Sequence, residues 1–233
     1  MVVNSVAMHM SDGIVNAPTS VVFLVIAVVA IGICAVKARN ELDERTVPLA
    51  GLVAAFIFAV QMVNFPILPG VSGHLLGGAL AAILVGPYTG GLCIAIVLIV
   101  QALLFADGGI TALGTNITNM AVVGVATGYG TAVALYALAR RRTPDVPVAG
   151  LGVVSFIAAV IGTVCAAMAF VVEYAIGGAG TTSLGAVVGY MLGTHALIGV
   201  GEGLITAVTV MAVARSRPDL VYLMRGARAE VPA

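Results

Sequence analysis

The sequence predicts an all-α, polytopic integral membrane protein, from its composition, the form of its apolar stretches and the placement of its basic residues. Of the 233 residues 61% are hydrophobic and 9% are charged, whereas about a quarter of the residues of a water-soluble domain are charged. The apolar stretches are continuous, which argues against the alternating pattern of a membrane β-barrel. Many of the 29 glycines lie inside these stretches, as is usual where bilayer helices pack closely.

Seven apolar stretches are candidates for transmembrane helices, in the order 20–36, 48–63, 75–86, 89–105, 117–138, 148–172 and 185–214. The third would be only about 18 Å long at 1.5 Å per residue, short for a hydrocarbon core of ~30 Å. An alternative joins it to the fourth in one helix kinked at Pro87, because proline can bend a bilayer helix without ending it.

The basic residues decide between six spans and seven. With seven spans every Lys and Arg of the chain lies on one side, and these are Lys37, Arg39, Arg45, Arg140, Arg141, Arg142, Arg215, Arg217, Arg225 and Arg228. With six spans the first loop is separated from the other two clusters. The positive-inside rule therefore predicts seven transmembrane helices, with the N-terminus outside and the C-terminus in the cytoplasm.

We expect one membrane domain over residues 8–214, a basic cytoplasmic tail over 215–233 and a leader over 1–7. The leader, "MVVNSVA", lacks the apolar region of a signal peptide. We therefore expect an over-extended gene start and a functional chain that begins at Met8, with cleavage after Ala7 as the alternative. The three cysteines lie in apolar stretches at unrelated spacings, which predicts neither a disulfide framework nor a zinc knuckle.

The seven-span topology places all three histidines, His9, His74 and His195, at or near the outer face. Asp107 and Glu173 lie near that face too. Only Glu202 lies deep in a span, two helical turns after His195, so both side chains share one helix face. Such a face must be turned toward protein. His195 and Glu202 are therefore functional residues or an interhelical hydrogen-bonded pair.

Two further polar features lie between the apolar stretches. In "GTNITNM", residues 114–120, Asn116 and Asn119 either belong to a re-entrant segment or cap the next helix. Asp12 and Asp107 each precede glycine and are typical of turns.

A chain that starts at Met8 has the donors of a square-planar metal site. The Met8 amine, the main-chain nitrogen of His9 and the His9 imidazole would form adjoining chelate rings, and His74 would supply a fourth nitrogen. This geometry suits nickel(II) or copper(II) and, with less preference, cobalt(II), whereas zinc prefers a tetrahedron. Four nitrogens leave no open position for substrate, so capture of the ion fits better than catalysis.

The chain also lacks motifs for driving transport itself. Its one lysine, Lys37, follows Val36, so the G-x-x-x-x-G-K-[ST] phosphate loop is absent. Paired carboxylates in two matching halves, typical of many ion-coupled secondary transporters, are also missing. We therefore expect a transporter subunit or receptor, and not an enzyme.

Four motifs resemble, in order, the CbiM/NikM family of substrate-capture components of energy-coupling-factor (ECF) transporters for cobalt and nickel. They are "MHMSDG" at 8–13, "SGHLLGG" at 72–78, "DGGITALGTNITNM" at 107–120 and "HALIGVGEGLIT" at 195–206. The resemblance implies a seven-helix membrane protein whose metal ligands are Met8, His9 and His74. It implies no cofactor of its own, because cobalt or nickel is the transported substrate. The leader departs from the family's Met-His start.

The resemblance also implies partners: a transmembrane coupling (T) subunit, two cytoplasmic ATPase subunits and often a small auxiliary membrane subunit, but no nucleic acid. We thus expect the substrate-binding subunit of an ATP-driven ECF uptake transporter in the bacterial plasma membrane. Asn116, Asn119, His195 and Glu202 are expected behind the metal ligands or in the packing around them. Nitrogen ligands do not separate cobalt from nickel. The alternatives are a membrane enzyme or haem carrier using His74 and His195, and a proton relay using His195 and Glu202.

Overall fold

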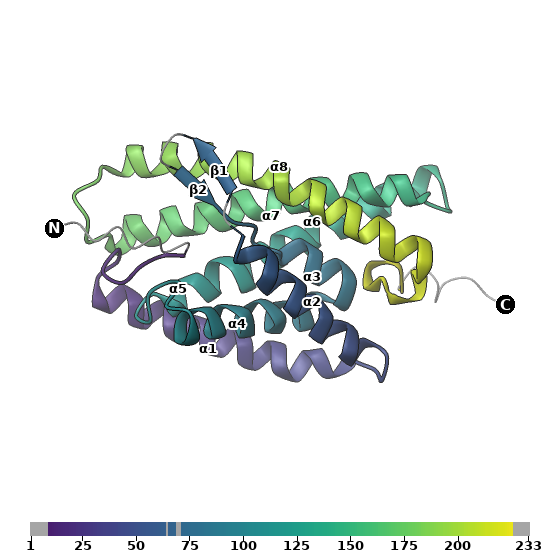
Figure 1. The fold of residues 1–233 in the computed structure, drawn as a ribbon, viewed down its shortest axis with the longest axis horizontal. Helices are drawn as coiled ribbons and strands as arrows, with labels where there is room; N and C mark the ends of the chain where they lie inside the picture. The colour runs from purple at the N-terminus through teal and green to yellow at the C-terminus, as the bar shows by residue number, and fades with distance from the viewer. Residues whose placement is uncertain (1–8, 64, 69–70, 226–233) are drawn as a thin grey trace.

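The helices run back and forth along the long axis of the molecule (Figure 1). The computed structural model describes residues 9–63, 65–68 and 71–225. Its α-helices are α1 (Ala17–Lys37), α2 (Thr46–Gln61), α3 (Gly78–Val85), α4 (Pro87–Leu104), α5 (Leu113–Ile117), α6 (Val125–Arg142), α7 (Val148–Gly177) and α8 (Leu184–Ser216). A π-helical stretch, η2 (Thr118–Gly124), joins α5 to α6.

Among the described residues, five helical stretches are long and apolar enough to cross a membrane: Ala17–Asn40, Pro87–Leu104, Leu113–Arg142, Val148–Gly177 and Leu184–Ser216. Helix α2 is apolar but has only 16 residues. These helices confirm the predicted class, an α-helical multi-pass membrane protein. Each of the seven predicted stretches coincides with a helix, while seven full crossings and the orientation of the termini stay predictions.

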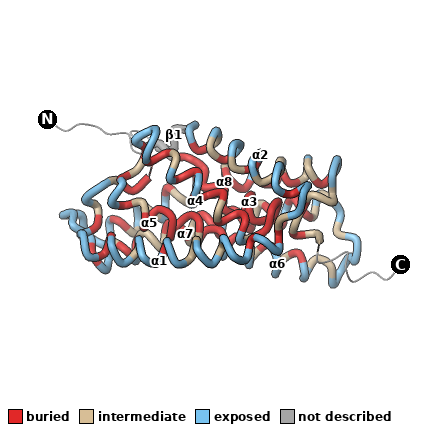
Figure 2. Tube along the Cα trace, turned by 90° about the horizontal axis from the view of Figure 1, so that it is seen from below, coloured by how far each residue is buried: buried red, intermediate tan, exposed pale blue. Residues whose placement is uncertain are grey.

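The third predicted stretch forms a short, central helix. Helix α3 has 8 residues, all of them buried, and at 1.5 Å per residue it is about 12 Å long. It packs against α2, α4, α6 and α7, in the buried interior coloured red in Figure 2. Helix α1, in contrast, exposes most of its apolar side chains, as a lipid-facing helix does.

Helices α3 and α4 are two helices and not one kinked helix. Gly86 lies between them at φ +100°, a conformation that favours glycine, and α4 begins with Pro87. The Glu41 carboxylate accepts hydrogen bonds from the main-chain N–H groups of Tyr88 (3.2 Å) and Thr89 (2.6 Å). A Cβ on Gly86 would lie 2.6 Å from Glu41 Cδ, so glycine also makes room for this cap.

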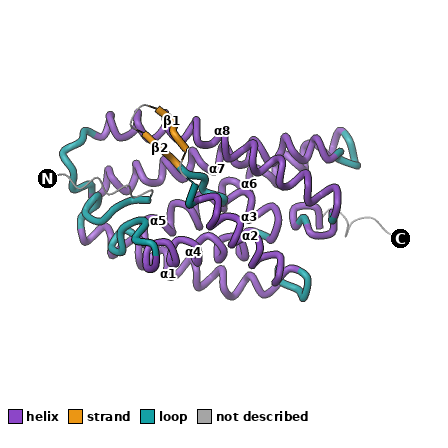
Figure 3. Tube along the Cα trace, in the orientation of Figure 1, coloured by secondary structure: helices purple, strands orange, loops and turns teal. Residues whose placement is uncertain are grey.

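The sequence did not predict a two-stranded antiparallel hairpin, β1 (Phe65–Leu68) and β2 (Val71–Gly73), in which Phe65 pairs with Gly73. It leads from α2 into the segment 74–77, which precedes α3. The hairpin is coloured orange beside α8 in Figure 3.

The two ends of the bundle differ in charge. One end, called here the histidine end, contains the N-terminal segment (residues 9–16) and the loops 105–112 and 178–183 (Figure 3). The described residues at that end include Asp12, Asp107 and Glu173 but no Lys or Arg. The opposite end, the arginine end, contains the α1–α2 and α6–α7 connections and the short helices η3 (Pro218–Leu220) and η4 (Tyr222–Met224) (Figure 1). Every described Lys and Arg lies there.

Candidate metal site

The N-terminal segment is fixed by the loop between α4 and α5. The Asn116 side chain contacts the Met10 main chain twice: Oδ1 accepts from the Met10 N–H (3.1 Å) and Nδ2 donates to the Met10 carbonyl (3.2 Å). The Gly109 N–H donates to the same carbonyl at 2.9 Å. Because Met10 directly follows His9, Asn116 determines where the His9 backbone lies.

Asp12 makes the second attachment between the same two segments. Its Oδ1 accepts hydrogen bonds from the Thr111 hydroxyl (2.6 Å) and the Thr111 N–H (2.8 Å). The hydroxyl bond is the main reason why the pKa of Asp12 lies below its ordinary value. A Cβ on Gly109 would collide with the Asp12 main-chain nitrogen and Oδ1, so the close approach requires glycine. Asp12 thus joins two motifs that are about a hundred residues apart.

A third contact joins the N-terminal segment to the end of α7. Val15 forms an antiparallel bridge with Gly178, and the Asn16 N–H donates to the Gly177 carbonyl at 2.7 Å. Asn16 also caps α1 by accepting from the Thr19 N–H at 3.0 Å. The N-terminal segment is therefore held between the α4–α5 loop and the end of α7.

Three side chains from separate segments meet beneath this attachment. The rings of His9 and His74 have centroids 4.5 Å apart and planes inclined by 42°, and His9 Nδ1 lies 3.3 Å from Asp107 Oδ2. His9, His74 and Asp107 are 8%, 7% and 8% exposed. Within the described part of the chain neither ring nitrogen of His9 has a hydrogen bond. Buried polar atoms normally have partners, so these nitrogens fit a ligand.

His74 is held by main-chain contacts around it. Its Nδ1 lies 2.9 Å from the Leu75 carbonyl oxygen. A carbonyl only accepts, so this contact makes Nδ1 the protonated nitrogen and leaves the lone pair on Nε2, the nitrogen able to bind a metal.

Glu202 fixes the turn that follows His74. Its Oε2 and Oε1 accept the N–H groups of Leu76 (2.8 Å) and Gly77 (2.9 Å), and the Thr163 hydroxyl donates to Oε2 at 2.9 Å. The Gln61 side chain donates to the Leu76 carbonyl at 2.7 Å. The carboxylate in α8 thus holds the segment that carries His74.

His195 makes no hydrogen-bonded pair with Glu202. Its Nδ1 lies 2.9 Å from the Met191 carbonyl oxygen and 3.2 Å from the Thr194 hydroxyl, both on its own helix, and the residue is half-buried. The bonds of Glu202 go to the turn after His74 instead. Both residues lie on α8, but their side chains bond to different neighbours.

Asn119 pairs with Glu173. Asn119 Nδ2 donates to Glu173 Oε2 at 2.7 Å, and both residues are buried. Asn119 lies in the π-helical stretch η2, and π-helical turns are frequent at functional sites. The pair ties this turn to α7, one turn after Phe170, which packs against the cluster of Met10, Val15 and Ala112.

Sequence reasoning missed the proximity of Asp107 to His9 and the parts played by Gln61 and Thr163. Asp107 was interpreted as a turn former, although it begins the same motif as Asn116. Gln61 and Thr163 are single polar residues in apolar helices and carried no signal. Met8 and the leader lie outside the described residues.

The described residues contain no group of three or more His, Cys, Asp or Glu side chains arranged to hold a metal ion. The predicted donor set takes only two side chains, His9 and His74, and draws the rest from the main chain. Its two side chains lie together.

Comparison of the sequence with known proteins shows the family to which this chain belongs. The model of CbiM, described as the cobalt uptake substrate-specific transmembrane region, matches residues 9–220. A putative fused nickel transport protein NikMN of Archaeoglobus fulgidus is 41% identical over 218 residues, which are 92% of this chain and 68% of the relative. A putative metal transport protein of Haloquadratum walsbyi is 40% identical over 215 residues, 92% and 94% of the two chains. The cobalt transport protein CbiM of Sorangium cellulosum is 32% identical over 219 residues, again 92% and 94%.

Two solved structures of transition metal transporters have a similar fold. The crystal structure of a transition metal transporter superposes with a TM-score of 0.79 at 26% identity and covers 96% of this chain and 100% of that one. A truncated transition metal transporter gives the same TM-score at 28% identity, with 90% and 99% covered. From residue 9 to residue 220, the chain belongs to the CbiM family of cobalt-uptake transmembrane proteins.

Proposed function

We propose that this chain captures cobalt(II) or nickel(II) at the outer face of the plasma membrane, as the substrate-binding subunit of an ECF-type, ATP-driven uptake transporter. The observation that carries the proposal is the meeting of His9 and His74, with ring centroids 4.5 Å apart. The names of the relatives, which include nickel and cobalt transport proteins, support the choice of ion.

In this proposal the ion is bound by the Met8 amine, the His9 main-chain nitrogen, the His9 imidazole and His74. The His9 nitrogen that closes a chelate ring with its own main-chain nitrogen is Nδ1, because Nε2 points away from the backbone. Nδ1 faces Asp107 at 3.3 Å, so the carboxylate lies beside the ion and offsets part of its positive charge. His74 binds through Nε2.

The charge distribution supports entry of the metal ion from the histidine end. Among the described residues there, Asp12 is exposed and no Lys or Arg is present, so this end favours cations more than the arginine end does. The positive-inside rule puts the arginine end in the cytoplasm, so we propose that the histidine end faces outward. Seven crossings, with α2 and α3 completing the five long helical stretches, give this arrangement.

The energy for uptake comes, in this proposal, from partners: a transmembrane coupling subunit, two ATPase subunits and a small auxiliary membrane subunit. The sequence has no phosphate loop. Purified chain in vesicles should therefore bind the ion without accumulating it, and accumulation should require ATP and the partners.

The deciding experiment is equilibrium dialysis of nickel and cobalt against purified chain that begins at Met8. Wild type should bind tightly, and His74→Ala should abolish tight binding because it removes the fourth nitrogen. His195→Ala is the matched control, since His195 bonds to its own helix, and its affinity should stay unchanged. Unchanged affinity in a folded His74→Ala protein would refute the site.

A second arm tests the amine. The full chain with its leader has an amide in place of the Met8 amine and should bind more weakly than the chain that begins at Met8. Equal affinity of the two proteins would remove the amine from the donor set. Intact-mass measurement of natively produced protein would show which start is used.

A further inference from the structure

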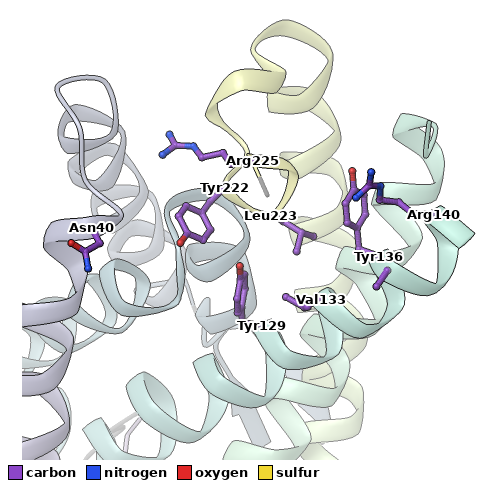
Figure 4. A pocket seen from close by; sticks show the side chains of 9 residues that line it. Asn40, Tyr129, Val133, Tyr136, Arg140, Tyr222, Leu223 and Arg225 are labelled. Atoms are coloured by element: carbon purple, nitrogen blue, oxygen red, sulfur yellow. The ribbon is translucent and has the colours of Figure 1, made fainter. Parts of the chain in front are cut away.

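A pocket of about 500 Å³ lies at the arginine end and is shown from close by in Figure 4. Its walls come from α6 between Tyr129 and Arg140, from η1 (Ala38–Asn40), from η4 and from Arg225. The volume falls within the range of about 300–1,000 Å³ that is common for small-molecule sites. The metal site uses none of its residues.

The polar groups of this pocket suit an anion. Two guanidinium groups, Arg140 and Arg225, line it together with the phenol groups of Tyr129, Tyr136 and Tyr222, and no acidic side chain does. In Figure 4 the rings of Tyr129 and Tyr222 face the same gap, with centroids 6.2 Å apart. Guanidinium and hydroxyl donors are the usual partners of phosphate oxygens.

Arg225 is already fixed in position. Its Nη2 donates to the Thr46 hydroxyl at 3.1 Å and its Nη1 to the Glu41 carbonyl at 3.4 Å. The guanidinium carbon lies 5.7 Å from the centroid of the Tyr222 ring. A side chain held in this way loses little conformational entropy when a ligand binds.

Nearby carboxylates make bonds of their own. Glu41 accepts the N–H groups at the start of α4, and Asp219 pairs with Arg217 at 2.8 Å. Asp43 lies 3.7 Å from Arg225 but also accepts three hydrogen bonds from Arg45 and Thr46. At this end the described residues carry nine Lys and Arg against five Asp and Glu, so the field favours anions.

The position along α6 points to a lipid. The α6 residues that line the pocket begin at Tyr129 and end at Arg140, which is about 16 Å of helix. They include Val133, which is 43% exposed. The pocket thus runs from an apolar flank to a basic rim at the level where the helix leaves its apolar stretch, and basic pockets between helices at this level bind anionic headgroups.

From these observations we propose that the pocket binds an anionic phospholipid, with Arg140 and Arg225 as the cationic groups on its two sides. The bound lipid would link η4 to α6 and so fasten the segment after α8 to the bundle. This proposal does not depend on the metal site and goes beyond the proposed capture of metal.

Binding is tested with the full chain in detergent by native mass spectrometry, with phosphatidylglycerol and phosphatidylcholine as probes. Phosphatidylglycerol should bind preferentially, and Arg140→Gln and Arg225→Gln should each weaken it about tenfold, the change that a loss of 1.4 kcal/mol gives. Arg142→Gln is the matched control, because it removes the same charge from the same helix end outside the pocket. Retained nickel binding at the opposite end would show that each variant is folded.

Three outcomes would overturn the proposal. One is equal binding of the two lipids, and another is unchanged phosphatidylglycerol binding in the Arg140→Gln, Arg225→Gln double variant. The third is specific to the source of the phosphate: if inorganic phosphate stabilises the protein through the two arginines while the lipid does not bind, the ligand is a soluble anion.

Discussion

Replacing Glu202 with glutamine tests whether this buried carboxylate positions His74, the proposed metal ligand. Glu202 accepts three hydrogen bonds, from the N–H groups of Leu76 and Gly77 and from the Thr163 hydroxyl. Glutamine keeps one acceptor oxygen and places an NH₂ group where the other was. The hydroxyl can rotate to accept from this group, but one main-chain N–H is left facing a donor.

The size of the effect follows from that count. One buried donor without an acceptor costs about 1–3 kcal/mol. If the turn after His74 shifts to relieve it, most of this free energy appears as lost metal affinity, about tenfold to a hundredfold. Loss of a group that orients a metal ligand typically lowers affinity by about the same factor.

Equilibrium dialysis of nickel and cobalt, together with the unfolding temperature of the metal-free protein, measures both effects for Glu202→Gln. Thr163→Val removes only the hydroxyl bond and should give a smaller loss of affinity, whereas His195→Ala should give none. Wild-type affinity for both ions in folded Glu202→Gln protein would refute the positioning role. A lower unfolding temperature with unchanged affinity would reduce Glu202 to a structural residue.

The remaining predictions concern the attachment of the N-terminal segment and the pH dependence. Asp107→Asn should weaken nickel binding by up to about tenfold in dialysis, because it removes a charge 3.3 Å from the predicted ligand atom; unchanged affinity would exclude a role for the charge. Asn116→Ala removes both hydrogen bonds to the segment and should raise proteolysis of the N-terminus as well as the dissociation constant. Gly177→Ala puts a Cβ against the Thr19 hydroxyl and should lower stability by about 1–3 kcal/mol in thermal unfolding. Binding should weaken from pH 8 to pH 5, because nitrogen donors must lose protons to the metal; the attachment through Asp12 should not, since the pKa of that carboxyl lies below its ordinary value and the group stays charged over this range.

Hydropathy and charge predicted the helices because both are properties of single segments. The predicted stretch 148–172 is α7 (Val148–Gly177), and 20–36 is α1 (Ala17–Lys37), since a long apolar run in lipid can satisfy its main-chain groups only as a helix. The short α3 was harder to assign. Its eight residues are buried entirely by other helices, so its hydropathy reports contact with protein as well as with lipid.

The contacts of the site could not be predicted from the sequence, because they join distant segments through main-chain atoms. The bonds from Leu76 and Gly77 to Glu202 link positions about 125 residues apart, and any residue has an N–H group. The sequence therefore marks the carboxylate but not its partner. The side-chain donors were easier to predict. The predicted topology placed all three histidines at one membrane face, which suggested a cluster, and two of them, His9 and His74, do lie together.

The two ends of the bundle suit ions of opposite charge. The histidine end combines the exposed carboxylate of Asp12 with buried His9 nitrogens that have no hydrogen bonds among the described residues, a combination that suits a divalent cation. The arginine end combines cationic side chains with an apolar-flanked pocket, which suits phosphate groups at a membrane surface. Because α7 and α8 run about 45 and 50 Å at 1.5 Å per residue and pack against each other, they connect the ends directly. Glu202 lies on α8 between them and accepts two hydrogen bonds from the turn after His74, so a shift of α8 at the arginine end would reach the proposed metal ligand through these two bonds.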